Sequence, residues 1–391
     1  MQAKSVSTMV SDPYRAGIAL GEALAPIQPE LVLLFSTVHY GGSTDLIDGV
    51  RDALESAAVL IVGNSGDGIY ETRRASDQGA VALGINSGGA VHWYAAAAQG
   101  VGADPERCTR QALTQLEQQL AGRTPRFILL FSDFRADATR IEAVIEREIS
   151  VPVVGGLAAD DNRMQTCYLY HGSEVLQDGI VMLAAEGALR FDISVGNALT
   201  AIGQAGLVNS AAGTHVEQID GVPAMEFIER ETGKPVLQTD RGILTLEVVN
   251  PAQPAERRLR SIVPDFSAGQ GQLGLYGGIE AGKQVRVCLA SPSELMAEVY
   301  RLAARREVLG FEPAAALVVS CAGRKAILGS AIEVEVSAIA KAFPQGLPLA
   351  GFPSFGEMAP LRNGDGYTPN LFHNMSYVLL LLGPEAGSLA G

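Results

Sequence analysis

The residues best suited to chemistry gather at Cys321, which ends an apolar run and is followed by Gly323 and Arg324. A guanidinium beside a thiol lowers the thiol pKa and makes a cysteine more reactive. A cysteine enzyme also needs a general base, and the sequence assigns no histidine to Cys321. Because buried cysteines are more often inert, a Cys321-dependent hydrolase or acyl transferase is an alternative rather than our first hypothesis.

A serine nucleophile is not indicated. Ser354 lies in the segment Phe352-Pro-Ser-Phe-Gly356, whereas the nucleophile elbow of serine hydrolases has the pattern G-x-S-x-G. The bulky Phe352 side chain stands where the sharp turn needs glycine. Since the sequence contains no complete catalytic constellation, we expect that the protein is not an enzyme.

The histidines give little support to a metal site. The five are scattered without metal-ligand spacing, at His39, His92, His171, His215 and His373. A single histidine can still ligate haem iron, and His39 follows a predicted strand. The interpretation of His39 that we favour is a solvated loop residue, with haem ligation as the alternative.

Three stretches of the chain repeat the order strand, helix, strand and glycine-rich loop, which is typical of a β-α-β unit. The helices are predicted from apolar spacing, as at Leu46, Val50 and Leu54. The predicted strands and helices cover residues 31–38, 43–56 and 59–63, then 127–133, 137–148 and 151–156, then 316–324, 333–343 and 347–351. Because loops at the carboxyl ends of parallel strands usually hold ligands, we expect the three glycine-rich loops to form a site.

Alternating segments between the second and third units predict antiparallel strands, at residues 166–170, 179–184, 189–195 and 242–247. A predicted helix over 223–231 is followed by Thr232-Gly-Lys-Pro235, which is a helix stop. We therefore expect a mixed α/β fold of two domains with mixed sheets flanked by helices. The expected division is an N-terminal segment at 1–25 and domains at 26–233 and 234–391.

Composition excludes several classes of partner. The 391 residues carry a net charge of -14 with a pI near 4.9, which disfavours nucleic acid and anionic membrane surfaces. The four cysteines form no C-x-x-C pair. Neither an apolar signal region nor a run of about 18 apolar residues is present, so we expect a cytoplasmic protein without membrane insertion.

Several short motifs, taken in order, resemble those of the FIST sensory proteins, with an N-terminal and a C-terminal FIST domain. The loops 63–69 and 155–160 and the segment 219–224 are similar to the N-terminal signatures. Segments 320–324, 351–360 and 373–376 are similar to the C-terminal signatures. The chain departs from the family patterns at Asn64, Asp67 and Pro353.

The resemblance implies a bacterial intracellular sensor of small molecules, amino acids among them. Family members act with histidine kinases, cyclic-di-GMP enzymes or chemoreceptors, and some bind haem and respond to nitric oxide. By resemblance, we expect this chain to bind an amino-acid-like metabolite and to regulate a separate histidine kinase or cyclic-di-GMP enzyme. The alternative is a haem-binding nitric oxide sensor that uses His39 to bind a diatomic gas.

The candidate ligand site combines polar and aromatic residues from the three loops and their surroundings. In this hypothesis Arg324 clamps a carboxylate and Glu357 an amine, since these groups form charge-assisted hydrogen bonds. Phe355 would wall the pocket and Asn374 would supply an amide hydrogen bond. The full set of candidate residues is Asn64, Ser65, Asp67, Asp160, Cys321, Arg324, Ser354, Phe355, Glu357 and Asn374.

Overall fold

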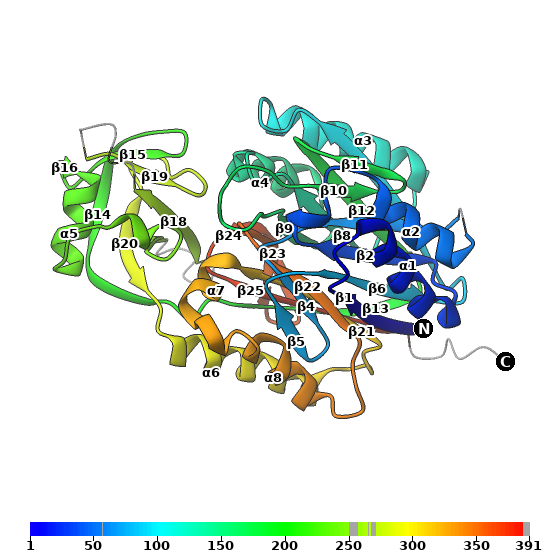
Figure 1. Cartoon of the computed structure of the whole chain (residues 1–391). Helices are drawn as coiled ribbons and strands as arrows, with labels where there is room; N and C mark the ends of the chain where they lie inside the picture. Colours follow the sequence, from blue (N-terminus) through cyan, green and yellow to red (C-terminus); the bar gives the residue numbers. More distant parts are fainter. Residues whose placement is uncertain (57, 250–256, 265, 267–270, 386–391) are drawn as a thin grey trace.

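The computed structural model describes residues 1–56, 58–249, 257–264, 266 and 271–385. Figure 1 shows a larger body in which helices cover β-sheets, and beside it a smaller β-rich part that contains β14, β15 and β20. The larger body consists of three units with the same order of elements. Each unit contains one of the predicted β-α-β stretches, and the mixed α/β fold is confirmed.

The first unit runs from an edge strand through a parallel strand pair to a hairpin and a return strand. β2 and β3 pair in parallel, with Leu31 opposite Leu60. All six residues of β2 are buried, as expected for a strand covered on both faces. The elements are β1 (Gln2–Thr8), α1 (Pro13–Leu24), η1 (Ala25–Ile27), β2 (Leu31–Ser36), η2 (Val38–Tyr40), α2 (Asp45–Leu54), β3 (Leu60–Ser65), β4 (Ile69–Glu71), β5 (Arg74–Ser76) and β6 (Ala80–Asn86).

The second unit repeats this order. Asp104 and Asp137 cap its two helices by accepting hydrogen bonds from backbone N–H groups, which explains where both helices begin. The elements are β7 (Val91–Gln99), α3 (Pro105–Leu120), β8 (Phe127–Ser132), α4 (Ala138–Glu148), β9 (Val153–Leu157), β10 (Leu169–His171), β11 (Glu174–Leu176) and β12 (Gly179–Gly187).

The third unit is interrupted after its first strand by the β-rich part. The segment between β21 and β22 contains two helices, α7 and α8, and α8 matches the helix predicted over 333–343. The elements are β13 (Leu189–Gly196), α6 (Pro292–Ala303), η4 (Ala304–Val308), β21 (Ala315–Cys321), α7 (Ala322–Leu328), η5 (Gly329–Ala331), α8 (Val334–Ala342), β22 (Leu349–Ser354), β23 (Glu357–Asn363), β24 (Gly366–His373) and β25 (Tyr377–Pro384).

The hairpin of each unit joins the sheet of a different unit. β4 pairs with β22, β10 pairs with β3, and β23 pairs with β9. The three six-stranded sheets have the orders β1-β6-β2-β3-β10-β11, β7-β12-β8-β9-β23-β24 and β13-β25-β21-β22-β4-β5. Each unit is therefore tied to both others, because its hairpin joins the sheet of one unit and its own sheet receives the hairpin of the other.

The inner faces of the three sheets enclose one core. Phe35, Phe131 and Phe352 come from the three units, with ring centroids 4.9 to 6.0 Å apart. On the outer faces, α1 and α2 cover the first sheet, α3 and α4 the second, and α6 and α8 the third. None of the helices within the described ranges is both long enough and apolar enough to cross a membrane.

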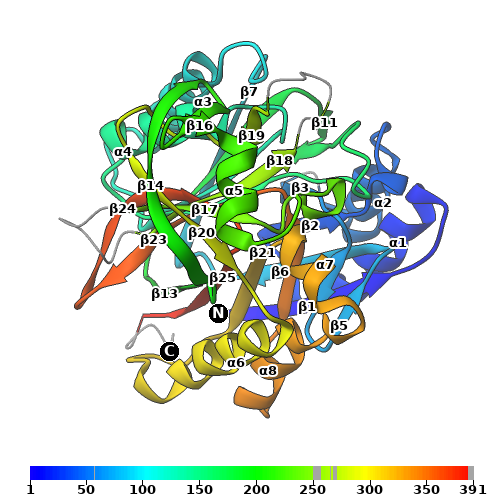
Figure 2. The same cartoon turned by 90° about the vertical axis from the view of Figure 1, so that its left-hand side faces the viewer.

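The β-rich part is a small barrel inserted between β13 and α6. It closes because β14 pairs with both β20 and β15. Figure 2 faces the barrel and shows α5 lying across it, where Phe227 and Ile228 enter the barrel core. The elements are β14 (Thr200–Ala212), β15 (His215–Ile219), β16 (Val222–Pro223), α5 (Ala224–Thr232), η3 (Gln238–Asp240), β17 (Thr245–Val249), β18 (Arg258–Pro264), β19 (Leu273–Leu275) and β20 (Gln284–Leu289).

The expected domain boundary near residue 233 falls within this barrel. Gly233 ends α5 with a positive φ of 70°, as the stop signal predicts. Residues 1–25 contain β1 and α1, which belong to the first unit. The division into domains at 26–233 and 234–391 stays a prediction.

Candidate ligand-binding site

The loops that follow β3, β9 and β22 lie against one another. Backbone N–H groups link them in a ring: Ala159 donates to Ser65, Leu157 to Gly356, and Asp67 to Pro353, at 2.8 to 3.0 Å. This is the arrangement expected when the carboxyl ends of three parallel strand pairs point to one region. The sequence therefore predicts correctly that the three loops come together.

The side chains of three candidate site residues form hydrogen bonds with the backbone of the loops. The Ser65 hydroxyl donates to the Ala159 carbonyl at 2.8 Å, and Asn64 Nδ2 donates to the Ser65 carbonyl at 2.8 Å. The Asp160 carboxylate accepts from the N–H groups of residues 164, 165 and 166 at 2.7 to 3.3 Å. All three side chains are buried, so they hold the loop conformation and do not face a cavity.

Asp67 connects the first loop to the helix α7. Lys325 Nζ lies 3.0 Å from Asp67 Oδ1 and donates to the Asp67 carbonyl at 2.7 Å. Burial raises the pKa of the Asp67 carboxyl to about 6, although Lys325 acts in the opposite direction. The Asp67–Lys325 pair thus fixes α7 against the first unit.

Arg324 does not face the cavity, contrary to the role expected from the sequence. Its guanidinium is fully buried, with Nε 2.8 Å from Glu335 Oε1 and one terminal nitrogen 3.2 Å from Glu298 Oε2. A buried guanidinium with two carboxylate partners is already neutralised. Arg324 therefore joins α7 to α8 and α6 and is not available to clamp a ligand.

A cavity lies where the loop after β22 and the start of α7 meet the barrel. Cys321, Ser354, Phe355 and Asn374, four of the candidate residues, line it from the larger body. The volume is about 50 Å³. Since a water molecule needs about 10–15 Å³ of such space, the cavity has room for a few waters or a small ligand group. The barrel side is lined by Arg241, Gly242, Ser261 and Tyr276.

Arg241 supplies the guanidinium of the cavity. Its Nε donates to the Tyr276 hydroxyl at 3.0 Å, which orients the guanidinium within the wall. Neither residue was among the candidates, because neither lies in a glycine-rich loop after a parallel strand. The sequence signal that could have pointed to them is weak: Arg241 precedes Gly242, and the positive φ of 73° at Gly242 marks a turn.

Gly323 allows the barrel to approach closely at the cavity. A Cβ at this position would lie 2.4 Å from the Gly242 carbonyl oxygen and 2.6 Å from Met375 Sδ. On the neighbouring wall, Asn374 Oδ1 accepts a hydrogen bond from the Ser261 N–H at 2.9 Å. Asn374 therefore binds the barrel backbone with its carbonyl group while it lines the cavity.

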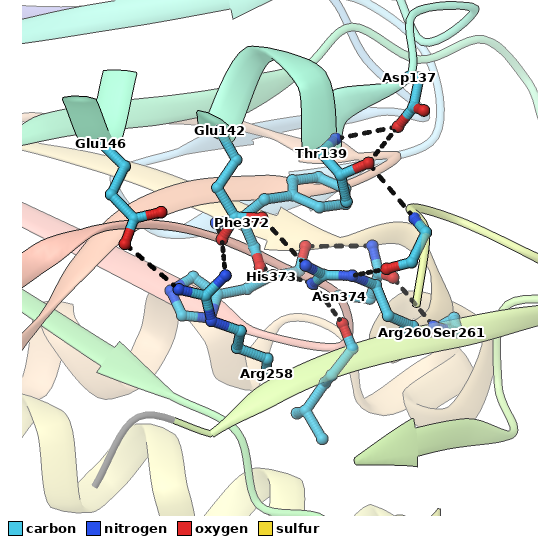
Figure 3. Close-up of polar contacts among 12 residues, drawn as sticks. Asp137, Thr139, Glu142, Glu146, Arg258, Arg260, Ser261, Phe372, His373 and Asn374 are labelled. Carbon is cyan, nitrogen blue, oxygen red and sulfur yellow. Dashed lines mark hydrogen bonds and ion pairs between the residues drawn. The ribbon is translucent and has the colours of Figure 1, made fainter. Parts of the chain in front are cut away.

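The opposite face of β18 attaches the barrel to the second unit (Figure 3). Because side chains alternate along a strand, Arg258 and Arg260 lie on one face of β18 and Ser261 on the other. Arg260 lies 3.0 Å from Glu142 Oε2 and donates to the Phe372 carbonyl at 2.9 Å, and the side chains of Arg260 and Glu142 are each 3% exposed. Arg258 lies 3.4 Å from Glu142 and 3.5 Å from Glu146. We call the group Glu142, Arg258 and Arg260 the latch.

Burial keeps two acidic groups at or near the cavity protonated at neutral pH, the Cys321 thiol and the Glu357 carboxyl. Burial raises the pKa of the Cys321 thiol far above its usual range. Burial raises the pKa of Glu357 to about 8, despite hydrogen bonds from Ser354 at 2.5 Å and from the Ser376 N–H at 3.1 Å. Glu357 does not line the cavity, and a neutral carboxyl is a poor partner for an amine.

His39 lies in η2, away from the cavity lining. Its Nδ1 is 3.2 Å from the Thr37 hydroxyl, and the residue is exposed, as expected for a solvated loop residue. Haem needs a wide apolar cleft beside its axial ligand, and His39 lines neither the cavity at Cys321 nor the three other principal cavities of the described residues. In the described ranges, no three His, Cys, Asp or Glu side chains are arranged to hold a metal ion. A haem-binding role of His39 stays a prediction.

The fold and the cavity define a three-unit α/β protein whose inserted barrel closes a small ligand-sized space. Known families match both parts of the chain: the FIST N domain over residues 30–222 and the FIST C domain over residues 224–360. The chain belongs to the FIST family, whose domains are associated with sensing in signal transduction.

Other relatives are more distant. A curated protein from Methanocaldococcus jannaschii, described as uncharacterized protein MJ1623, is 32% identical over 98 residues, which are 25% of this chain and 19% of that protein's length. Among solved structures, cyanuric acid hydrolase from A. caulinodans aligns over 98% of this chain and 99% of its own, with 11% identity and a TM-score of 0.39. T. maritima PurL complexed with ATP aligns over 98% and 71%, with 11% identity and a TM-score of 0.21. TM-scores of 0.39 and 0.21 are too low to support a conclusion about the function of this chain.

Proposed function

We propose that the protein is a sensor that binds the carboxylate group of a small, amino-acid-like metabolite in the cavity between the barrel and the third unit. The observation that supports this most is the oriented guanidinium of Arg241, which lines the cavity beside Tyr276. A guanidinium binds a carboxylate through two parallel hydrogen bonds. Ser261, Asn374 and Phe355 add neutral polar groups and an aromatic wall.

Binding would be coupled to the position of the barrel. The cavity of about 50 Å³ accepts a carboxylate but not the rest of an amino acid. A complete ligand must therefore displace the barrel wall at Gly242 and Tyr276. We propose that this movement is the signal, and that a separate histidine kinase or cyclic-di-GMP enzyme in the cytoplasm responds to it.

We further propose that the site binds and does not catalyse. At neutral pH the Cys321 thiol keeps its proton because burial raises its pKa, whereas a cysteine nucleophile must be a thiolate. The histidine closest in sequence, His373, is fully buried with Nε2 2.8 Å from the Ala359 carbonyl, and burial lowers its pKa to about 4. Neither group has the environment of a cysteine–histidine pair.

The test is a thermal-shift screen with the natural amino acids and short-chain carboxylates, followed by calorimetric titration of the compounds that stabilise the protein. Substituting Arg241→Gln should weaken binding about tenfold or more, since a charge-assisted hydrogen bond contributes about 1.5–3 kcal/mol. The matched control is Arg163→Gln, because Arg163 is 70% exposed and is next to the cavity residue Asn162. Equal affinities for the wild type and Arg241→Gln would contradict the proposal.

Two further measurements address the output and the alternative. A kinase or cyclic-di-GMP enzyme that co-purifies with the chain should change its turnover when the ligand is added, and the change should be lost with Arg241→Gln. Titration of the purified protein with haemin should give no stoichiometric Soret band. A sharp band that is lost in His39→Ala would instead support the haem sensor.

A further inference from the structure

A second cleft, separate from the cavity at Cys321, lies where the barrel leaves the third unit. Its volume is about 260 Å³, and it shares no lining residue with the first cavity. Three arginines line it from three parts of the chain: Arg257 precedes β18, Arg305 lies in η4, and Arg362 lies in β23. In a chain with a net charge of -14, such a concentration of guanidinium groups needs an explanation.

One carboxylate serves two of these arginines. Asp192 Oδ1 lies 3.7 Å from a terminal nitrogen of Arg305 and also contacts Arg362. Its other oxygen accepts a hydrogen bond from the Ser194 hydroxyl at 3.1 Å. Within the part of the chain that the structure describes, Arg305 and Arg362 have no other carboxylate within 4.0 Å. The pair therefore carries one uncompensated positive charge.

The third arginine is neutralised and fixed. Arg257 Nε lies 2.7 Å from Glu247 Oε1, and its terminal nitrogens donate to carbonyl groups of Asn197 and Leu199 at 3.2 Å. Arg257 thus forms a fixed part of the cleft wall, and the uncompensated positive charge belongs to Arg305 and Arg362. Arg305 is the residue with unused hydrogen-bonding capacity, since its buried Nε finds no acceptor among the described residues.

We propose that this cleft binds the phosphate group of a small metabolite, bridged between Arg305 and Arg362. A planar carboxylate matches one guanidinium fork, whereas the tetrahedral oxygens of a phosphate reach two guanidiniums that face the cleft from different elements. The phosphate supplies the missing negative charge beside Asp192. It would also connect η4, which precedes β21 of the third sheet, to the β23–β24 hairpin, which lies in the second sheet.

The experiment is calorimetric titration of the full chain with sodium phosphate at low ionic strength. Phosphate should bind the wild type, and Arg305→Ala and Arg362→Ala should each weaken binding about tenfold, the effect of losing one hydrogen-bonded charge. The control is Arg301→Ala, because Arg301 lies one turn earlier on α6, is 70% exposed and is outside the cleft. Should an alanine variant fail to fold, Arg362→Lys keeps the charge opposite Asp192 while losing the fork, and it should also bind more weakly.

Titrations with other ligands show whether the cleft binds the phosphate of a metabolite or free phosphate. Tighter binding of adenosine monophosphate than of phosphate would support a phosphorylated metabolite, and the reverse would support free phosphate. Acetate binding as tightly as phosphate, or equal phosphate affinity in the wild type and all three cleft variants, would overturn the proposal. Arg241→Gln should bind phosphate normally, so this result is independent of the proposed sensing site.

Discussion

Glu357 is a residue whose protonation state at neutral pH is set by its surroundings. It is completely buried at the start of β23, where it accepts hydrogen bonds from Ser354 and from the Ser376 N–H. Because desolvation penalises the ionised carboxylate, the pKa rises to about 8. Glu357 is therefore a neutral structural group next to a cavity residue, Ser354, and its ionisation opposes folding.

This assignment predicts how stability depends on pH. Between the pKa of the unfolded chain, near 4.3, and about 8, the folded state holds a proton that the unfolded state has lost, so the free energy of unfolding falls as pH rises, by up to about 1.4 kcal/mol per unit. Comparing the wild type with Glu357→Gln isolates this contribution, because Asp67 and His373, with pKa values near 6 and 4, titrate in both proteins. Urea unfolding of Glu357→Gln should therefore give a stability that falls less with pH between 6.5 and 8 than that of the wild type. An equal slope in wild type and variant would show that Glu357 is ionised when folded.

The contrast between two arginines shows what sequence can and cannot predict at a site. Arg324 was a reasonable candidate because it follows Cys321 at the end of a predicted strand. Its real partners, Glu298 and Glu335, lie on two other helices, and no local pattern indicates that they reach it. Arg241 comes from the barrel, and it meets the cavity only through tertiary packing. Residues of the loop itself, such as Ser354 and Phe355, were predicted from local order alone.

At the scale of elements, three glycines allow the two parallel strands of each unit to pair closely. Gly63, Gly155 and Gly351 lie in β3, β9 and β22, the second parallel strands of the three units. A Cβ at these positions would lie 1.8, 1.9 and 2.0 Å from the carbonyl oxygen of Leu34, Leu130 and Val318. Each glycine is also paired with a residue of the incoming hairpin. The repeated close approach indicates the same local requirement in all three units.

We therefore expect Gly351→Ala to destabilise the protein. Val318 lies in the neighbouring parallel strand, so its carbonyl can move only by disrupting the β21–β22 pairing. Overpacking of this kind costs about 1–3 kcal/mol or more. The control is Gly366→Ala at the exposed start of β24, where the nearest atom to an added Cβ is 3.8 Å away. Urea denaturation measures both, and a Gly351→Ala variant as stable as the control would disprove a steric need for glycine.

The three β-α-β units were predictable and the hairpin exchange was not. Each unit is built from local apolar runs, and their periodicity is visible in the sequence. The hairpins have strands of three residues in the first two units, and they pair with strands from another part of the chain. Residues 69–71, for example, pair with β22 some 280 positions later. Short polar strands carry too little pattern to specify such partners.

At the scale of the whole molecule, β18 separates two contacts of the barrel. On one face, Ser261 lines the cavity, and on the other, Arg260 reaches Glu142 of the second unit. Any displacement of the barrel by a ligand must therefore strain or break the latch. Because Arg260 and Glu142 are both buried, losing Arg260 leaves Glu142 with only the partly exposed Arg258 as an ionic partner.

The latch provides the last prediction. Arg260→Met should destabilise the attachment of the barrel by about 1.5–3 kcal/mol, the usual contribution of a hydrogen bond to a charged group, because Glu142 keeps only Arg258 as an ionic partner. Hydrogen exchange followed by mass spectrometry should then be faster in β18 and β24, while β2 and β21 stay protected. The double variant Arg260→Met/Glu142→Gln should recover part of the loss, since the buried carboxylate that lost Arg260 is then uncharged. Arg258→Met removes the other partner of Glu142 and should cost less, because Arg258 is 31% exposed. If exchange rose equally throughout the core sheets, the barrel would not move as a separate part, and the coupling between cavity and latch would have to be abandoned.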